Sequence, residues 1–294
     1  RDLVLGGGSN VLFAADVEGT VILNRVTGKK VIEETGETAL LEASGGENWH
    51  QLVLWSLEQG LSGIENLSLI PGLVGAAPIQ NIGAYGVELA DVLDSVEAHD
   101  LKTAQTRNFD RNDCEFAYRD SRFKSMDAGR VLITRIRLRL QRSFKARLDY
   151  AGIAQELEAM GITNPGAKQV SDAIIRIRQR KLPDPRVTGN AGSFFKNPVT
   201  DRQFANELRR LFKDMPVYET GEDRVKLSAA WMIDQCGWKG RSLGGAAVSR
   251  QHALVLINEN NASGADVLAL AKAIRASVLE RFGIELQPEP RIIS

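Results

Sequence analysis

The sequence predicts an α+β fold built from two domains. Three observations support this: the chain has 294 residues, its first half consists of short apolar runs broken by glycine, and apolar residues recur at helical spacing from about residue 150. Such a chain is long for a single hydrophobic core. We expect one domain at residues 1–165 and a smaller one at 166–294. The proline-containing segment 181–185 predicts a rigid, extended connector near this boundary.

The first domain is predicted to be rich in strands. Leu3–Leu5 and Val21–Leu23 are short apolar runs typical of buried strands. Residues 135–140 alternate arginine with isoleucine or leucine, which predicts a strand with one buried and one wet face. A helix is expected at residues 47–59, where Gly60 ends the apolar spacing.

The second domain is predicted to be richer in helices. Thr200 with Gln203 forms a capping-box pattern ahead of an apolar helical stripe. Ser263 with Asp266 forms another before the longest stripe, which a glycine ends. An apolar strand is expected at 253–257, between the two helices.

Composition excludes several classes of protein. Lys and Arg together number 37, as do Asp and Glu, so there is no basic surplus for nucleic-acid binding. No apolar run approaches the roughly 18 residues of a membrane helix, and nothing resembles a signal peptide. Cys114 and Cys236 form neither a disulfide framework nor a metal-ligand pattern. We therefore expect a cytoplasmic protein without a metal site.

The first of two glycine-rich segments predicts a phosphate loop. Gly6-Gly7-Gly8-Ser9-Asn10 follows a strand directly, and glycines let backbone amides converge on a phosphate. The residues after it are too few for the crossover helix of the common dinucleotide-binding fold. A plain tight turn is the alternative.

The second segment, 71–86, predicts an irregular backbone wall. Its sixteen residues include four Gly, three Ala and two Pro, which disfavour both helix and strand. Such a backbone suits close approach to a large planar ligand with a pyrophosphate. A purely structural Ω-loop is the alternative.

These segments resemble the UDP-N-acetylenolpyruvoylglucosamine reductases. The likeness rests on Gly-Ser-Asn-Val-Leu at 8–12, on Ile70-Pro71-Gly72 and on Gly83-Ala84-Tyr85-Gly86, and it extends over nearly the whole chain. It points to the subtype with an extra substrate-covering loop. The resemblance implies an FAD-binding domain of the vanillyl-alcohol oxidase and p-cresol methylhydroxylase type, with a smaller α/β substrate-binding domain. Against the family, one N-terminal βαβ unit of roughly 30 residues is absent, so we expect an N-terminally incomplete sequence.

The resemblance also implies the reaction. Members use FAD and NADPH to reduce UDP-N-acetylglucosamine enolpyruvate to UDP-N-acetylmuramate, a step in peptidoglycan precursor synthesis. His50, His99 and His252 all lie outside the first glycine loop, where some flavin enzymes attach the cofactor, so we expect non-covalent FAD. No second dinucleotide motif is present for NADPH, which agrees with the family's scheme of two substrates using one cleft in turn. We expect a monomer.

Three residues match the family's catalytic positions. Ser193, in Asn-Ala-Gly-Ser-Phe-Phe, matches the proton donor; Arg119, in Tyr-Arg-Asp, matches the guanidinium that holds the substrate carboxylate; and Glu289 matches the catalytic glutamate. Hydride addition creates enolate charge, which needs an electrostatic stabiliser and a general acid. Taken without the resemblance, the three would be a turn serine, a surface ion-pair residue and a solvated charge.

Binding residues follow from the same comparison. Cations suit the UDP diphosphate, and a tyrosine on the covering loop suits a lid. The residues expected to bind FAD are Gly6, Gly7, Gly8, Ser9, Asn10, Pro71, Gly72, Gly75, Ala77, Asn81 and Gly83. Those expected to contact substrate are Tyr85, Tyr150, Lys181, Asn197, Lys226 and Arg291. An alcohol or phenol oxidase of the same flavin fold would not need the Lys181, Asn197 and Lys226 set. A non-catalytic binder would not need Ser193, Arg119 or Glu289.

Overall fold

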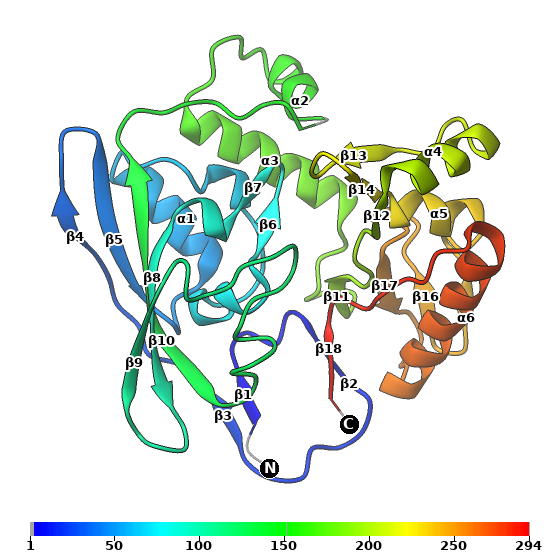
Figure 1. Cartoon of the computed structure of the whole chain (residues 1–294), viewed down its shortest axis with the longest axis horizontal. Helices are drawn as coiled ribbons and strands as arrows, with labels where there is room; N and C mark the ends of the chain where they lie inside the picture. Colours follow the sequence, from blue (N-terminus) through cyan, green and yellow to red (C-terminus); the bar gives the residue numbers. More distant parts are fainter. Residues whose placement is uncertain (1–2, 151, 294) are drawn as a thin grey trace. The chain divides into compact units, whose positions relative to one another are not determined.

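Figure 1 shows the computed structural model of the chain, which describes residues 3–150 and 152–293. The described residues divide into two compact units. The first contains the chain up to Gly8 and Glu18–Arg178, and the second contains Ser9–Val17 and the chain from Gln179 onward. The division after Arg178 falls inside helix α3 (Ala167–Lys181), and the expected boundary at 165/166 precedes that helix. A short N-terminal segment belongs to the second unit, which the sequence did not indicate.

A five-stranded antiparallel sheet forms the centre of the first unit, with β10 in the middle of the order β4-β5-β10-β8-β9. The strands are β4 (Lys29–Glu34), β5 (Thr38–Ser44), β8 (Leu93–Asp100), β9 (Thr106–Asp110) and β10 (Val131–Gln141). Ile136, Leu138 and Leu140 of β10 are all fully buried. The strand expected at 135–140, with its alternation, is therefore confirmed.

Helix α1 (Trp49–Glu58) packs its apolar side against one face of this sheet. Leu52 of the helix and Leu41 of β5 belong to the same buried cluster. The Asn48 side chain accepts a hydrogen bond from the first turn, and Gly60 follows the helix with φ +72°. The predicted helix is confirmed, with its ends shifted by one or two residues.

The opposite face of the sheet carries charges that pair across strands. Arg137 of β10 contacts Glu42 of β5 at 2.9 Å, and Lys30 of β4 contacts the same carboxylate at 3.5 Å. Burial would raise the pKa of Glu42, but the hydrogen bond and charge of Arg137, helped by Lys30, hold it below its ordinary value. This face is therefore stabilised by a ladder of ion pairs.

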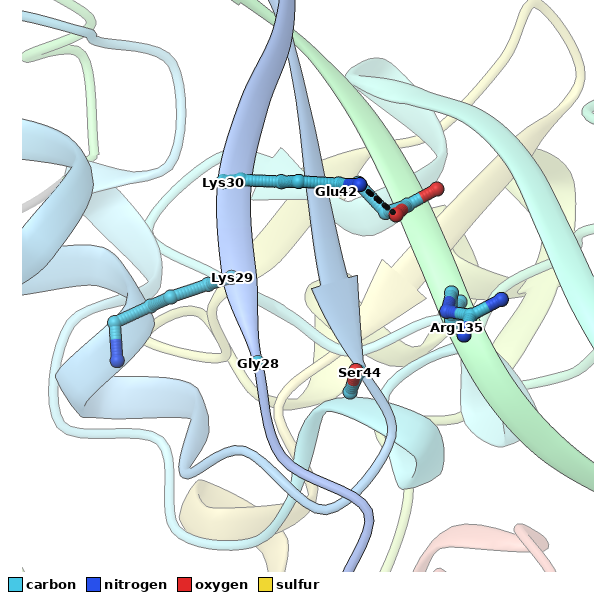
Figure 2. A pocket seen from close by; sticks show the side chains of 6 residues that line it. All are labelled: Gly28, Lys29, Lys30, Glu42, Ser44 and Arg135. Atoms are coloured by element: carbon cyan, nitrogen blue, oxygen red, sulfur yellow. Dashed lines mark ion pairs between the residues drawn. The ribbon is translucent and has the colours of Figure 1, made fainter.

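A hollow of about 270 Å³ opens on the charged face, as Figure 2 shows. It is lined by Gly28, Lys29, Lys30, Glu42, Ser44 and Arg135. Lys29 is held by Glu47 at 3.1 Å and Arg135 by Glu97 at 2.9 Å, while Lys30 has the Glu42 contact described above. Each lining cation therefore contacts a carboxylate, which weakens its attraction for an anionic ligand.

Shorter elements complete the first unit. Strand β1 (Leu3–Leu5) pairs in parallel with β3 (Val21–Leu23), which confirms both as strands. Val21 and Leu23 are exposed, so the expected burial of the second strand is wrong. A small hairpin joins β6 (Gly83–Ala84) to β7 (Val87–Glu88). Helix α2 (Ile153–Ala159) packs on α3 through a separate apolar cluster.

In the described part of the second unit, two antiparallel sheets are accompanied by helices and by one parallel strand pair. One sheet contains β11 (Asn190–Ser193), β17 (Val255–Asn258), β16 (Ala246–Val248) and β15 (Ser242–Leu243). The other contains β12 (Val199–Asp201), β14 (Arg224–Leu227) and β13 (Val217–Glu219). The helices are α4 (Arg202–Leu211), α5 (Ala229–Gln235) and α6 (Gly264–Phe282), and β2 (Val11–Phe13) pairs with β18 (Arg291–Ile293).

The longest helix, α6, has the predicted ends. Ser263 and Asp266 form the expected capping box, and Gly283 closes the helix with φ +67°. Its apolar stripe, including Leu270 and Ile274, is buried in the core of the second unit. Within the residues that the structure describes, no helix combines the length and apolarity needed to cross a membrane.

Two local predictions are wrong. Thr200 does not cap a helix, because it lies in β12 opposite Val225, and α4 begins only after Asp201. Strand pairing here prevails over the capping pattern. Lys181 is the last residue of α3, so the extended connector begins after it and not at it.

Candidate active site

The two glycine segments lie against each other in the first unit, although they are far apart in sequence. A side-chain carbon added at Gly7 would lie 3.1 Å from the Cα of Gly72, and one added at Gly6 would lie 3.3 Å from the Cβ of Ala76. Contacts this close leave little room for a side chain. The backbone of Gly72 therefore explains glycine at position 7, and the side chain of Ala76 leaves little room for a larger residue at position 6.

Gly8 has a different environment. Its φ is +67°, and a side-chain carbon added there would meet nothing within 4 Å. Gly7 and Gly8 are exposed, Ser9 is partly buried, and Pro71 is exposed at the start of the second segment. The turn therefore presents bare backbone on an open side, which fits the diphosphate of a dinucleotide such as FAD.

Further along the second segment, the chain packs onto the sheet in two 3₁₀ turns, Val74–Ala76 and Pro78–Gln80. Gly75 is buried, and its amide donates a 2.8 Å hydrogen bond to the carbonyl of Gly45. A side-chain carbon there would lie 2.9 Å from the carbonyl oxygen of Ile133. Ala77 is also buried. Packing accounts for both residues, and their assignment to the cofactor stays a prediction.

Arg119 lies in a tight turn that reaches the second glycine segment. Backbone hydrogen bonds of 3.1 Å join Ala117 and Asp120 in both directions, and the φ of Arg119 is +54°. A non-glycine residue keeps this conformation only where its surroundings enforce it. Its Nη2 donates a 2.6 Å hydrogen bond to the carbonyl of Gly83, where an added side-chain carbon would lie 2.9 Å from Nη1. Glycine at 83 therefore makes room for the guanidinium.

Arg178 joins this group, although the sequence did not single it out. Its Nε donates to the carbonyl of Leu69 at 3.3 Å, and its guanidinium hydrogen-bonds Tyr85. Burial lowers the pKa of Arg178, and the charge of Arg119 lowers it further. Two guanidinium groups that repel each other favour an anionic ligand. No local pattern distinguishes Arg178, because arginines also stand at 176 and 180.

Tyr85 and Tyr150 are in contact beside this group. Their rings meet edge to face with centroids 5.4 Å apart. Burial raises the pKa of Tyr85, and the nearby Arg178 partly offsets this. Tyr150 is 46% exposed and lies on the segment between β10 and α2, whose Phe144 and Leu148 pack on the α2–α3 cluster. The segment that we expect to cover the substrate thus packs on helices α2 and α3 of the first unit.

In the second unit, Ser193 ends strand β11 on an apolar support. It is partly buried, and Phe194 and Phe195 behind it are 2% and 1% exposed. Gly192 has φ +70°, so the chain turns sharply just before the serine. The amide of Glu289 donates a 2.9 Å hydrogen bond to the carbonyl of Phe194. The structure therefore brings the segments of Ser193 and Glu289 together.

The end of the first glycine segment contacts the segment that contains Glu289. Asn10 donates from Nδ2 to the carbonyl of Glu289 at 3.4 Å, and the amide of Arg291 donates to the carbonyl of Asn10 at 3.0 Å. The parallel pairing of β2 with β18 extends this contact. Asn10, Glu289 and Arg291 are thus neighbours, which their sequence positions do not indicate.

The remaining predicted residues of the second unit lie at element ends or on strands. The Oδ1 of Asn197 accepts a 3.0 Å hydrogen bond from the amide of Ala229 at the start of α5. Lys226 stands opposite Val199 in the β12–β14 pair and is partly buried. Lys181 is exposed at the end of α3.

His252 lies within the electrostatic reach of Lys181 and Lys239. Burial lowers the pKa of His252, and the charges of Lys181 and Lys239 lower it further. The two lysines therefore place positive charge around a neutral imidazole, an arrangement suited to a phosphate. Neither His252 nor Lys239 was predicted to take part in the site.

Comparison with known proteins gives consistent matches over both units. Residues 2–108 match the family model described as an FAD binding domain, and residues 184–293 match that of the UDP-N-acetylenolpyruvoylglucosamine reductase C-terminal domain. The chain is 53% identical over 290 residues to the UDP-N-acetylenolpyruvoylglucosamine reductase of Burkholderia vietnamiensis, covering 98% of this chain and 83% of that one. For the enzyme of Burkholderia ambifaria the identity is 51% with the same coverage.

A solved structure shares the fold. The crystal structure of UDP-N-acetylenolpyruvylglucosamine reductase from Thermus caldophilus aligns with a TM-score of 0.64 at 23% identity, covering 100% of this chain and 85% of that one. The fold is therefore α+β, with an FAD-binding domain of the vanillyl-alcohol oxidase type followed by the C-terminal domain matched at residues 184–293.

Proposed function

The chain belongs to the UDP-N-acetylenolpyruvoylglucosamine reductase family, and from this premise we propose that it reduces UDP-N-acetylglucosamine enolpyruvate to UDP-N-acetylmuramate with NADPH. It is an FAD-dependent oxidoreductase of peptidoglycan precursor synthesis. The observation that carries the proposal is the hydrogen bond that fixes Glu289 beside the segment of Ser193, since the reaction needs a proton donor supported by polar groups.

FAD would be held without a covalent bond by the glycine segments. When bound, it supplies the ring that takes a hydride from NADPH and delivers it to the substrate. The bare backbone at Gly7 and Gly8 would approach the diphosphate, with Gly6, Ser9, Asn10, Pro71 and Gly72 around it. The conformation of the second glycine segment beside FAD would depend on its own residues Gly75, Ala77, Asn81 and Gly83.

Arg119 would hold the carboxylate of the enolpyruvyl group. Its planar guanidinium can donate two parallel hydrogen bonds to a carboxylate and spread the charge that develops next to it. The second guanidinium, Arg178, would strengthen the field at this point. Tyr85 and Tyr150 would cover the bound sugar nucleotide and limit the access of water.

Ser193 would donate the proton that completes the reduction, at the carbon that carries the developing negative charge. A hydroxyl is a weak acid, so its placement and its polar neighbours determine the rate. Glu289 would orient and polarise this hydroxyl. Its segment is fixed there by two backbone hydrogen bonds, one to Phe194 and one from Lys196 to Gln287, each 2.9 Å long.

The UDP diphosphate would bind to the cationic set of the second unit. Lys181, Lys226 and Asn197 are the expected contacts, and Arg291 is expected nearby. Lys239, whose charge acts on His252 together with that of Lys181, would add to the same field.

A spectroscopic experiment tests this function. The purified protein should show a flavin spectrum that NADPH bleaches under anaerobic conditions, and the enolpyruvyl substrate should restore it. UDP-N-acetylglucosamine, which lacks the enolpyruvyl group, serves as the control and should not. Recovery with oxygen alone would indicate an oxidase, and absence of bleaching would indicate a binding protein.

A further inference from the structure

The turn that carries Arg119 is fastened to the second glycine segment on both of its sides. Asn81 donates from Nδ2 to the carbonyl of Ala117, which opens the turn, at 3.2 Å. Ser121, just after the turn, donates from Oγ to the carbonyl of Ile79 at 2.8 Å. Each segment thus supplies one side chain and one carbonyl, and the two bonds bracket the guanidinium.

Both side chains are committed to this role. Asn81 is 0% and Ser121 is 2% exposed. The second Nδ2 hydrogen of Asn81 goes to Glu88 at 2.8 Å, and its Oδ1 accepts from the amide of Ala90 at 3.0 Å. Both the nitrogen and the oxygen of the Asn81 side-chain amide are therefore hydrogen-bonded to other protein groups. This favours a structural role for Asn81 over direct contact with FAD.

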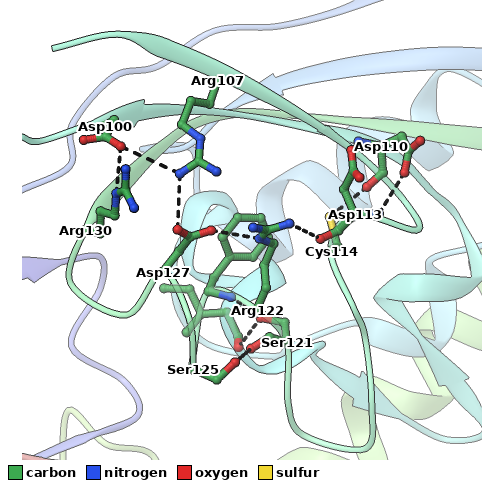
Figure 3. A network of polar contacts seen from close by, with 12 residues as sticks. Asp100, Arg107, Asp110, Asp113, Cys114, Ser121, Arg122, Ser125, Asp127 and Arg130 are labelled. Atoms are coloured by element: carbon green, nitrogen blue, oxygen red, sulfur yellow. Dashed lines mark hydrogen bonds and ion pairs between the residues drawn. The ribbon is translucent and has the colours of Figure 1, made fainter. Parts of the chain in front are cut away.

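The rest of the loop is fixed on the sheet by an ionic network, shown in Figure 3. Asp127 accepts from Arg122 at 2.8 Å and from Arg107 of β9 at 3.2 Å. Asp100, at the end of β8, accepts from Arg130 at 2.8 Å. The ion pairs hold the loop at its far side, and the bonds from Asn81 and Ser121 add two anchors at the turn itself, beside the bond from Arg119 to Gly83.

We propose that Asn81 and Ser121 are positioning residues for Arg119. The left-handed backbone of Arg119, with φ +54°, is kept because its neighbours on both sides are held. Loss of either bond would let the turn relax and move the guanidinium away from the substrate carboxylate. The inference rests on the role of Arg119 in the proposed function, and it replaces the direct FAD contact expected for Asn81.

The test begins with Asn81→Gly. Asn81 has φ +45°, which glycine adopts without strain, so this change removes the side-chain bonds and leaves the backbone conformation accessible. We expect flavin content and flavin reduction by NADPH to be unchanged. Reoxidation by the enolpyruvyl substrate should slow by roughly 10- to 100-fold, the scale of a displacement of about 1 Å. Loss of flavin would overturn the proposal.

A double mutant separates positioning from a general structural effect. If Asn81 acts only through Arg119, then Asn81→Gly should cause no further slowing in an Arg119→Ala background. Additive effects would contradict the proposal. Ser121→Ala should repeat the result of Asn81→Gly. Ser125→Ala is the matched control, because its hydroxyl donates to the backbone carbonyl of Ser121 and its loss leaves the bond from Ser121 Oγ to Ile79 in place.

A measurement independent of activity completes the test. The amide of Asp120 is bonded across the turn to Ala117, so its hydrogen exchange reports the closure of the turn. Exchange at this amide should be faster in Asn81→Gly than in the native protein, and unchanged exchange would refute the proposal. If the native protein fails to reduce the enolpyruvyl substrate, the proposed function fails while this exchange result still decides the positioning role.

Discussion

The amide of Glu289 donates a 2.9 Å hydrogen bond to the carbonyl oxygen of Phe194, the residue that follows Ser193. A second bond of the same length, from Lys196 to Gln287, continues the contact. The two chain segments therefore form one ordered element, so the backbones that carry the Ser193 hydroxyl and the Glu289 carboxylate are held side by side. Predictions about the proton donor can be made on this basis.

Ser193→Ala should slow substrate reduction by roughly 10²- to 10⁴-fold, the usual span for a general acid. Reduction of the flavin by NADPH should stay nearly the same, because that step needs no proton from the serine. Stopped-flow absorbance of the two half-reactions measures both rates. Ser242→Ala, which removes an exposed hydroxyl bonded to Glu259, is the control. Equal slowing of both half-reactions would mean that Ser193 only shapes the pocket.

Lys181→Ala should weaken binding of the UDP-sugar by roughly tenfold or more. A hydrogen bond to a charged group contributes about 1.5–3 kcal/mol, and 1.4 kcal/mol is about a tenfold change in affinity. Titration calorimetry gives the dissociation constant directly. Lys168→Ala, on the same helix and paired with Asp172, is the control and should bind normally. Unchanged affinity in Lys181→Ala would refute the diphosphate assignment.

Gly75→Ala should destabilise the first unit by about 1–3 kcal/mol, the usual cost of overpacking. The added carbon would lie 2.9 Å from the carbonyl of Ile133 and 3.1 Å from the Cα of Gly45, and both are backbone atoms that cannot turn aside. Urea unfolding followed by circular dichroism measures the change. Gly36→Ala is the control, since an added carbon there meets nothing within 4 Å. Equal midpoints for both variants would show that the loop is looser than described.

Asp100 should make stability depend on pH in the acid range. Burial would raise its pKa, but the amides of Thr103 and Lys102 and the guanidinium of Arg130 lower it from 3.8 to about 2. The unfolded chain therefore takes up a proton before the folded one as the pH falls from about 4 to about 2. The stabilisation is complete above pH 4 and is lost over this range.

Asp100→Asn tests this expectation. The variant should be less stable than the native protein above about pH 4, and the difference should shrink toward pH 2, where about half of the native carboxylate is protonated. Unfolding free energies from urea titrations at several pH values give the comparison. Asp201→Asn, at an exposed position whose side chain makes no cap bond, should follow the native curve. A constant difference at all pH values would show that the Asp100 charge is unimportant.

The elements predicted well from sequence are those specified by local chemistry. The box of Ser263 and Asp266 and the left-handed Gly283 need only neighbouring residues, so α6 has its expected ends. The alternation in β10 likewise follows from one buried face. Thr200 was misplaced because its pairing with Val225 is a long-range contact that no local pattern reports.

The candidate site was only partly predictable for the same reason. The resemblance supplied Ser193, Arg119 and Glu289, but their contacts depend on segments far apart in the chain. Arg178 stands in an arginine-rich helix with no distinguishing neighbour, and only its burial beside Tyr85 and Arg119 draws attention to it. Asn81 was expected at the ligand, and the bonds of its amide to Ala117, Glu88 and Ala90 are the basis on which we propose a positioning role instead.

The pairing of β2 with β18 has a practical consequence for dissecting this protein. The second unit is built from two stretches of chain, Ser9–Val17 and the chain from Gln179 onward. In the sequence, Glu18–Arg178 of the first unit separates them, although their strands β2 and β18 pair. A fragment cloned from residue 179 onward would leave β18 as an unprotected edge, which invites aggregation. Expression of that unit alone calls for a rearranged gene, in which residues 9–17 are joined by a short linker to the other piece.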